Sequence, residues 1–329
     1  MKLLLLSFLF LSPLPISGQS LPRREDNPVP SKVDSMYEKG LRFLAKEQKE
    51  DGSWEGQSRY SSEPGVVALC ILAFLAHGED PNHGPYAKNI SKALTYIRDN
   101  QNSDNGYIGN SMYNHGFATL ALAESYGVVN DPRLAASLSK AVKLILSAQE
   151  RNPANAWRYT PDSQDADSTV AGCQLVALLA ARNAGIAIPD KAIEKGLAYL
   201  KRCRSSRGGI GYTSPSGEKP TLTAIGVTCF ALAKQKEGKG FAASVDFLRS
   251  NLTYRDRHYP YYFEYYMSQA LFHADEELWQ NWNAKNIRYL SNSQLRNGSW
   301  ADNKGAHFAT AGALLSMALN YRFLPIYEK

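Results

Sequence analysis

The chain has 329 residues, of which 44% are hydrophobic and 21% are charged, and its formal net charge is +6. This balance is that of a soluble globular protein, and the length allows one large domain or two small ones. Lysine and arginine are spread along the chain, whereas a nucleic-acid-binding surface concentrates them in a stripe with interleaved aromatic residues. We therefore expect no nucleic-acid partner, and we interpret the excess positive charge as a contribution to solubility.

The N-terminal segment has the layout of a signal peptide. Lys2 precedes the apolar run 3–11, and small residues come before Gln19. The run is too short to span a bilayer, and no later stretch is long enough. A short membrane anchor is the alternative interpretation. We expect an exported protein with a signal peptide at 1–18, a flexible leader at 19–33 that is rich in proline and charge, and a single domain at 34–329.

One pattern recurs along the chain at helical spacing: Lys, a small residue, an aliphatic residue, any residue, a bulky apolar residue and an aliphatic residue. Its copies begin at Lys39, Lys92, Lys140 and Lys195, with degenerate copies at Ala243 and Lys285. Each copy predicts a helix with an apolar stripe and a Lys-rich face, so one side of the helix meets solvent. We expect these helices to form an outer layer.

A glutamine and a Gly-aromatic element follow most of these copies. The glutamine stands nine residues after the start of four copies, as Gln48, Gln101, Gln149 and Gln294. Elements such as Gly52–Trp54 and Gly298–Trp300 come next. Because the last carbonyls of a helix have no partner within it, the glutamine can bond the loop there, and the tryptophan can cover the start of the next helix. Since these residues recur in successive repeats, we interpret them as structural.

A second pattern follows each copy of the first: Gly, three residues, an apolar residue, Ala or Cys, and Leu or Ile. Clear copies begin at Gly65, Gly116, Gly172 and Gly226, and weaker copies end in Ala270-Leu271 and Ala313-Leu314. These segments are apolar or small almost all round, which predicts buried inner helices that approach one another closely. Because neighbouring repeats bury each other's faces, we predict an all-α fold, a closed α6/α6 toroid with its polar loops at one end.

The combination of this helix pattern with Gln and Gly-x-Trp, known as the QW motif, resembles the repeat of squalene and oxidosqualene cyclases. Lys39–Trp54 and Lys285–Trp300 match it closely. The resemblance covers about residues 34–325 and identifies the chain as a member of the terpenoid cyclase and protein prenyltransferase superfamily. More narrowly, the chain resembles exported bacterial prenyltransferase and squalene oxidase repeat proteins, whose chemistry is generally unassigned. Such motifs are specific for the fold and much less specific for activity.

The resemblance singles out the stretch 165–169. In squalene-hopene cyclases an Asp-x-Asp-Asp-Thr motif starts an inner helix, and its middle Asp protonates an alkene. Asp167 takes the place of that acid, while Ser168 replaces the last Asp of the motif. The resemblance therefore implies a terpene-cyclase-type isomerase that needs no cofactor, with Asp167 as general acid and with Asp165 and His115 tuning it. Those cyclases use two barrel domains, however, and this chain has one.

Helix capping is the alternative role for Asp167. Counting back from each Ala-Leu pair, the equivalent positions hold Ser111, Thr221 and Asn303. Ser, Thr, Asn and Asp are the preferred N-caps. A helix N-terminus also stabilises the ionised carboxylate, whereas protonation of an alkene requires the un-ionised acid. Capping therefore explains Asp167 without catalysis, and both interpretations stay open.

The segment His258–Phe272 breaks the small-residue rule of the inner helices because tyrosines crowd it. Such rings can hold an apolar or cationic ligand, or they can fill the centre of the barrel. We name five candidate ligand-binding residues near this end: Tyr113, Tyr261, Tyr262, Glu264 and Tyr265. His115 lies at the same end, where it could titrate near neutrality or belong to a polar cap region.

Other activities of related toroids lack their residues here. Protein prenyltransferases hold zinc through Asp, Cys and His; His307 lies near Thr310, but no Asp-x-Cys pair precedes it. A catalytic zinc needs three protein ligands, so we expect no metal. The spacing of the cysteines fits no zinc pattern, and we expect buried free thiols at Cys70, Cys173, Cys203 and Cys229.

Two main functional hypotheses follow. The first is an exported toroid that binds an apolar, isoprenoid-like small molecule or a peptide in its concave end, without demonstrable catalysis. The second is the terpene-cyclase-type enzyme. A glycan-cleaving barrel is a third alternative on fold analogy, because such enzymes use a carboxylate pair and Asp165, Asp167, Asp256 and Glu264 belong to the same end. The sequence leaves the oligomeric state open.

Overall fold

The computed structural model describes residues 29–55 and 63–327. In these ranges the chain forms twelve α-helices and two short 3-10 helices, and it contains no β-strand. The predicted signal peptide at 1–18 and most of the leader at 19–33 lie outside the described residues. The first helix begins at Ser31, so the last residues of the expected leader belong to the folded domain.

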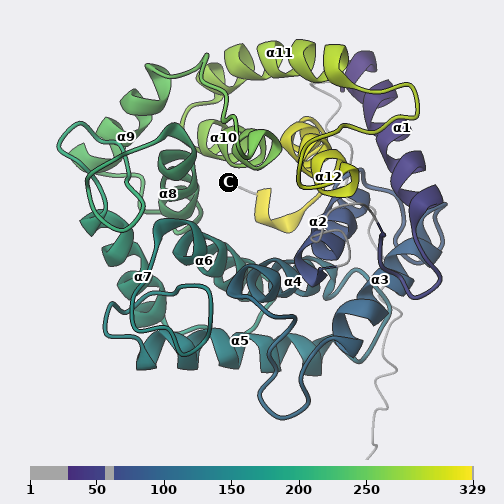
Figure 1. Cartoon of the computed structure of the whole chain (residues 1–329), viewed down its shortest axis with the longest axis horizontal. Coiled ribbons are helices and arrows are strands. Elements are labelled where there is room, and N and C mark those ends of the chain that lie inside the picture. The colour runs from purple at the N-terminus through teal and green to yellow at the C-terminus, as the bar shows by residue number, and fades with distance from the viewer. Residues whose placement is uncertain (1–28, 56–62, 328–329) are drawn as a thin grey trace, which may run out of the picture.

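The helices alternate between two concentric rings (Figure 1). The outer ring consists of α1 (Ser31–Glu47), α3 (Ala87–Asp99), α5 (Leu134–Arg151), α7 (Asp190–Arg202), α9 (Lys239–Arg249) and α11 (Glu276–Ser293). The inner ring consists of α2 (Pro64–Leu75), α4 (Met112–Ser125), α6 (Ser168–Asn183), α8 (Pro220–Leu232), α10 (Pro260–Ala274) and α12 (Ala306–Met317). Each inner helix packs on the next, and α12 packs on α2, which closes the ring. The predicted α6/α6 toroid is thereby confirmed.

Burial follows the two sequence patterns. The outer helix α7 buries one stripe, which includes Ile193, Leu197 and Leu200, while every residue of the inner helix α2 is buried. The small residues of the inner helices are needed for close approach: a Cβ atom on Gly172 of α6 would lie 2.0 Å from Cγ2 of Ile225 in α8. The division into solvent-facing and fully buried helices was therefore readable from the spacing of apolar residues.

The four glutamines of the repeat link successive outer helices. Gln48 Nε2 donates to Gly52 O in its own loop at 3.1 Å and to Asn89 O of α3 at 3.0 Å. Gln101, Gln149 and Gln294 make the same pair of bonds in their repeats, one to the following loop and one to the next outer helix. The predicted structural role of the glutamines is confirmed, and it extends to joining neighbouring repeats.

The tryptophans of the repeat bond back to the helix before them. The indole N–H of Trp54 donates to Leu44 O at 2.7 Å. Trp157 and Trp300 donate to Ile145 O and Leu290 O in the same way, at 2.8 and 2.9 Å. The side chain thus satisfies a carbonyl near the end of its own outer helix.

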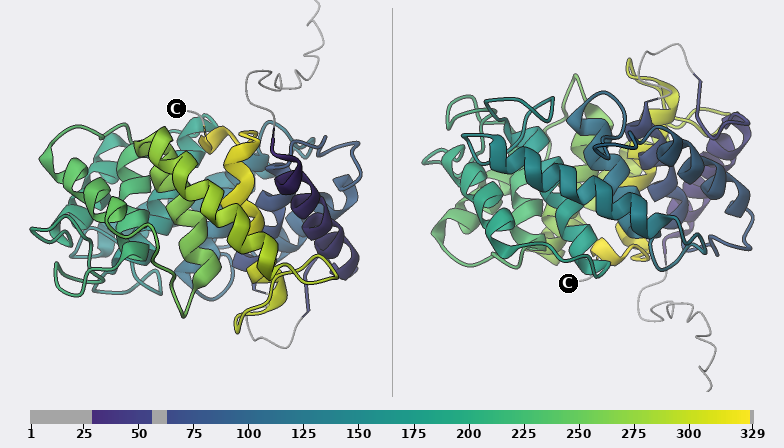
Figure 2. Two further views of the ribbon diagram at one scale, coloured as in Figure 1. Left: turned by 90° about the horizontal axis from the view of Figure 1, so that it is seen from above. Right: turned by 90° about the horizontal axis from the view of Figure 1, so that it is seen from below.

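The two ends of the toroid differ. The start of α1 and the end of the described chain lie at one end, and the loops after the outer helices α1 and α11 lie at the other (Figure 2). At the first end the C-terminal 3-10 helix Pro325–Tyr327 lies within the ring (Figure 1), and Ile326 N donates to Glu124 Oε2 at 3.3 Å. The chain's own C-terminal segment therefore occupies this end of the bore, the central region enclosed by the inner ring. The opposite end of the bore, where the inner helices begin, is the mouth and contains the candidate site.

No helix in the described ranges is long and apolar enough to cross a membrane. All four cysteines are buried free thiols, as predicted. Burial raises the pKa of the Cys70 thiol far above its ordinary value, because the thiolate would lose its hydration in the core. The cysteines therefore act as small apolar core residues.

Candidate functional site

Asp167 caps the start of α6 at the mouth of the bore. Its Oδ1 accepts hydrogen bonds from Thr169 N and Val170 N, both at 2.9 Å, and from Thr169 Oγ1 at 2.5 Å. Ser111 caps α4 in the same way, since its side chain accepts from Asn114 N at 3.2 Å. The capping interpretation is therefore confirmed for these two helices.

The expected caps of the fourth and sixth inner helices are wrong. Helix α8 begins at Pro220, and Thr221 lies inside its first turn, where its hydroxyl donates to Asp256 Oδ2 at 2.6 Å. Helix α12 begins after Gly305, which has a φ of +110° that favours glycine. Proline at the first helical position and glycine before the helix replace a side-chain cap there. Among the inner helices that the structure describes, only α6 is capped by a carboxylate, that of Asp167, while the outer helix α11 is capped by Asp275.

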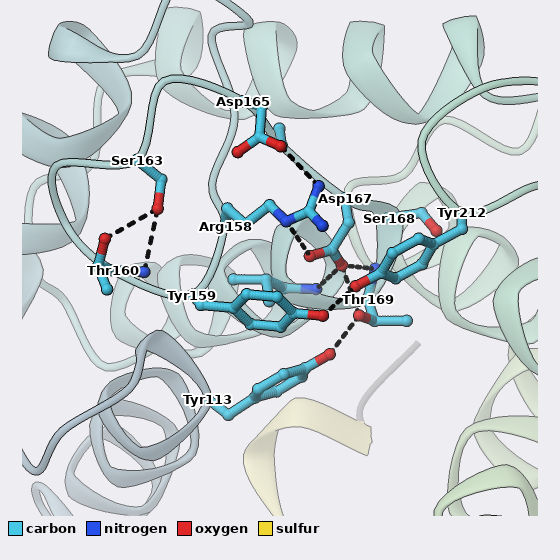
Figure 3. A network of polar contacts seen from close by, with 12 residues as sticks. Tyr113, Arg158, Tyr159, Thr160, Ser163, Asp165, Asp167, Ser168, Thr169 and Tyr212 are labelled. Atoms are coloured by element: carbon cyan, nitrogen blue, oxygen red, sulfur yellow. Dashed lines mark hydrogen bonds and ion pairs between the residues drawn. The ribbon is translucent and has the colours of Figure 1, made fainter.

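Arg158 connects the two carboxylates of the motif. Its Nη1 lies 2.7 Å from Asp165 Oδ2, and its Nε lies 3.8 Å from Asp167 Oδ2 (Figure 3). Asp165 is 69% exposed, whereas Asp167 is fully buried, and its Oδ2 has no hydrogen-bond partner among the described residues. Burial raises the pKa of Asp167, while its hydrogen bonds with Thr169 and the charge of Arg158 oppose the rise.

Three tyrosines surround this carboxylate–guanidinium group. The guanidinium carbon of Arg158 lies 5.1 Å from the ring centroid of Tyr159 and 5.5 Å from that of Tyr212, and the hydroxyls of these two tyrosines share a hydrogen bond (Figure 3). The Tyr113 hydroxyl bonds Thr169 Oγ1. Because Thr169 donates its own proton to Asp167, Tyr113 is the donor in this bond. The rings and charges are thus fixed relative to one another by α4, α6 and two loops.

A column of aromatic rings lies beneath this network in the bore. Tyr262 of α10 meets Phe117 of α4 edge to face, with ring centroids 6.3 Å apart. Below it, Tyr266 lies 4.9 Å from Tyr262 and 4.8 Å from Tyr265. Tyr265 and Tyr266 are buried and fill the centre, whereas Tyr262 is half-buried. Of the two uses expected for these tyrosines, filling the centre of the barrel therefore holds for Tyr265 and Tyr266.

Two of the expected ligand-binding residues face the outer layer instead of the bore. Glu264 is fully buried, with its Oε1 3.1 Å from Arg255 Nε, and Arg255 stacks over the ring of Tyr289 in α11. Burial raises the pKa of Glu264 to about 8, although Arg255 lowers it in part. Tyr261 interacts with Tyr289 as well. We therefore correct the expectation for Glu264 and Tyr261, which pack between α10 and α11.

His115 does not reach Asp167. Its Nδ1 accepts from Ile108 N at 3.1 Å, and its Nε2 donates to Ala141 O of α5 at 3.0 Å. The ring is fully buried, and burial lowers the pKa of His115 to about 4. The expectation that His115 tunes the acid or titrates near neutrality is therefore corrected: the neutral ring holds a loop against the outer layer.

Sequence reasoning missed Arg158. The signal was present, because Arg158 is the only basic residue in the loop 152–167, which carries Asp162, Asp165 and Asp167. An isolated cation among three acids is a candidate partner for any of them. Within residues 29–55 and 63–327, no three His, Cys, Asp or Glu side chains are grouped to hold a metal ion.

The fold is that of terpenoid-cyclase-like α/α toroids. The type II terpene cyclase MstE from Scytonema superposes with a TM-score of 0.62 at 15% identity, over 89% of this chain and 99% of that chain. The GH76A α-1,6-mannanase of Salegentibacter sp. HEL1_6 gives 0.65 at 10% identity, over 87% and 98%. No family model matches the sequence, and no curated protein matches it. Because a cyclase and a glycan-active enzyme both share this architecture, the fold alone does not select an activity.

Proposed function

We propose that this toroid binds an apolar, isoprenoid-like small molecule at the mouth framed by the starts of α4, α6 and α10. The observation that carries the proposal is the position of Tyr262, whose half-buried ring joins the polar network around Asp167 to the buried rings of the bore. Aromatic rings offer a hydrocarbon chain large apolar faces at a fixed position. A peptide is the alternative occupant of the same mouth.

The class of ligand is supported by a neighbour of the same fold. The MstE cyclase has been seen with geranylgeranyl dihydroxybenzoate as substrate, in a structure that superposes here with a TM-score of 0.60 at 14% identity. We also propose that the chain is exported through the segment 1–18. Mass spectrometry of the N-terminus of the secreted protein tests that part: a mature chain that still begins at Met1 contradicts it.

A second candidate function is proton transfer from Asp167 to an alkene. It is favoured by the buried Asp167 Oδ2, which lacks a hydrogen-bond partner among the described residues and belongs to a carboxyl whose pKa is raised. Arg158 opposes it, since a cation 3.8 Å from the same oxygen stabilises the ionised form. Binding without turnover is therefore the primary proposal.

Ligand titration tests the primary proposal. We expect the purified mature protein to bind geranylgeraniol in isothermal titration calorimetry, and Tyr262→Ala to weaken binding by about tenfold or more, since a buried aromatic anchor contributes on the order of 2 kcal/mol. Tyr126→Ala is the matched control, because Tyr126 is exposed at the far end of α4. Equal affinity of wild type and Tyr262→Ala for geranylgeraniol would show that the ligand does not bind at this mouth. Tight binding of a peptide, without binding of an isoprenoid, would support the alternative.

The same samples test the catalytic candidate. Incubation with geranylgeraniol, followed by gas chromatography and mass spectrometry, detects any cyclised isomer. Formation of such an isomer by wild type and its loss in Asp167→Asn would establish proton transfer, because asparagine has no acidic proton. Recovery of unchanged geranylgeraniol from both proteins, together with measurable binding, is the outcome expected from the primary proposal.

A further inference from the structure

We propose that Arg158 binds a carboxylate group of the ligand, and that Asp165 takes the place of this carboxylate in the unliganded protein. The inference rests on the proposed function, since the apolar part of the same ligand is placed on Tyr262. It specifies the ligand as an isoprenoid-like carboxylic acid. It also gives a role to the second carboxylate of the motif, which pairs with Arg158 and does not cap α6.

The Arg158 guanidinium has the position of an anion-binding group. Tyr159 and Tyr212 hold it through their ring faces, at 5.1 and 5.5 Å, so that it is placed before any ligand arrives. Its side chain is 22% exposed, so part of it is accessible to solvent. Arginine binds carboxylates through parallel N–H groups, and a positioned guanidinium loses little freedom in doing so.

The side chain of Asp165 can leave Arg158 at little cost in stability. Its side chain is 69% exposed, and exposed ion pairs contribute little to stability, so opening the 2.7 Å contact with Arg158 has a low cost. Its main chain is held independently: Asn152 Nδ2 donates to Asp165 O and to Ser163 O, both at 2.8 Å. The side chain can therefore rotate into solvent while the loop stays in place.

The buried Asp167 limits the charge of the ligand. Arg158 already serves two carboxylates, because Asp167 Oδ2 lies 3.8 Å from its Nε and has no hydrogen-bond partner among the described residues. Replacing Asp165 by another carboxylate keeps the local charge constant. A diphosphate would add further negative charge beside a buried carboxyl, which is unfavourable in a partly desolvated site. The geometry therefore favours a carboxylic acid over a diphosphate.

The tyrosine pair offers a further donor at the same place. The hydroxyls of Tyr159 and Tyr212 share one hydrogen bond, which uses one of their two protons. The second proton is available to an acceptor at the mouth, and Tyr159 is 45% exposed. A ligand carboxylate can thus accept from Arg158 and from one tyrosine hydroxyl, whereas an uncharged alcohol oxygen can accept from Arg158 but forms no ion pair with it.

The test compares four probes by calorimetry on the mature protein: geranylgeranoic acid, geranylgeraniol, geranylgeranyl diphosphate and benzoate. We expect the acid to bind at least about tenfold more tightly than the alcohol and the diphosphate, the usual size of a charge-assisted bond. We expect Asp165→Asn to tighten binding of the acid several-fold and to leave the alcohol unchanged, because it removes only the competing carboxylate. Asp162→Asn is the matched control and should leave binding of the acid unchanged. Asp162 lies on the same loop as Asp165 but pairs with Arg151 of α5, at 3.2 Å.

Arg158→Gln should abolish the preference for the acid over the alcohol. If that variant fails to fold, Arg158→Lys is the substitute, because it keeps the positive charge and removes the parallel N–H groups. Equal affinities of wild type for acid and alcohol, or no response of the acid to Asp165→Asn, would overturn the inference while leaving the proposed function intact. Benzoate binding that depends on Arg158, with no binding of any isoprenoid, would retain the anion site and reject the proposed function. Failure of all four probes to bind rejects both.

Discussion

Gln294 Nε2 donates to Met36 O at 2.9 Å and so joins the end of the last outer helix to the first across 258 positions of sequence. The same amide donates to Gly298 O at 2.9 Å. In the other three repeats that carry this glutamine, the equivalent bond links successive outer helices, but here it closes the ring. The bond from glutamine to the next outer helix therefore both links successive repeats and closes the toroid.

Removal of this closing residue should loosen the whole ring. We expect Gln294→Ala to lower the free energy of unfolding by about 2 kcal/mol, since two partly buried hydrogen bonds contribute about 1 kcal/mol each. Urea unfolding followed by circular dichroism measures it. The neighbouring Leu295→Ala, at a side chain that is 49% exposed, is the control and should change stability little. Similar losses in the two variants would mean that the hydrogen bonds of Gln294 contribute no specific free energy of unfolding.

Variants of Asp167 separate its capping role from its acidity. We expect Asp167→Ala to cost about 0.5–2 kcal/mol of stability, because the N–H groups of Thr169 and Val170 lose their acceptor. Asp167→Asn should cost much less, since asparagine is as good an N-cap as aspartate. Thermal unfolding by differential scanning calorimetry gives both values. A loss in Asp167→Asn as large as in Asp167→Ala would show that the charge, and not the cap, is what the fold requires.

Glu264 should make the protein less stable as pH rises. Burial raises the pKa of Glu264 from 4.5 to about 8, so between these values the folded state holds a proton that the unfolded state has released. Stability therefore falls with rising pH, by up to about 1.4 kcal/mol per pH unit for one proton. Urea unfolding at pH 5, 6, 7 and 8 measures the slope, and Glu264→Gln should reduce it. An unchanged slope in the variant would show that Arg255 keeps Glu264 ionised.

His115 should give a slope of the opposite sign at lower pH. Burial lowers the pKa of His115 from 6.5 to about 4, so between these values the unfolded state is protonated and the folded state is not. Stability therefore falls as pH decreases from about 6.5 towards 4. Guanidinium unfolding across this interval should show a shallower decline in His115→Gln than in wild type. Parallel curves for the two proteins would contradict the buried, neutral ring.

Most of the fold could be predicted from the spacing of residues. The recurrence of Lys39 and its equivalents identified the outer helices, and the Gly65-type pattern identified the inner ones, because amphipathic and all-apolar helices differ in period and composition. The structural role of the glutamines could be predicted because the last carbonyls of a helix have no partner within it. The partners of Gln294 and the direction of the Trp300 indole could not, since both depend on which repeats become neighbours in space.

The candidate site was predicted only in part. Asp167 and Ser111 were correctly placed at helix starts, because capping is decided by a few consecutive residues. Arg158 was missed, since its contacts with Asp165 and Asp167 depend on the folding of the loop that carries them. Thr221 and Asn303 were wrongly expected to cap, because a proline or a glycine nearby set the helix start instead.

The sequence by itself determined the helices, their order, the division into outer and inner rings and the residues that join them. The tertiary structure decided which side chains meet in the bore. On α10 it turned Tyr262 towards Phe117 and turned Glu264 towards Arg255. The physical reason is that α10 is buried on nearly all sides, so it has no amphipathic stripe to mark the face that looks into the bore. Only the packing of its neighbours distinguishes that face, and the candidate site lies there.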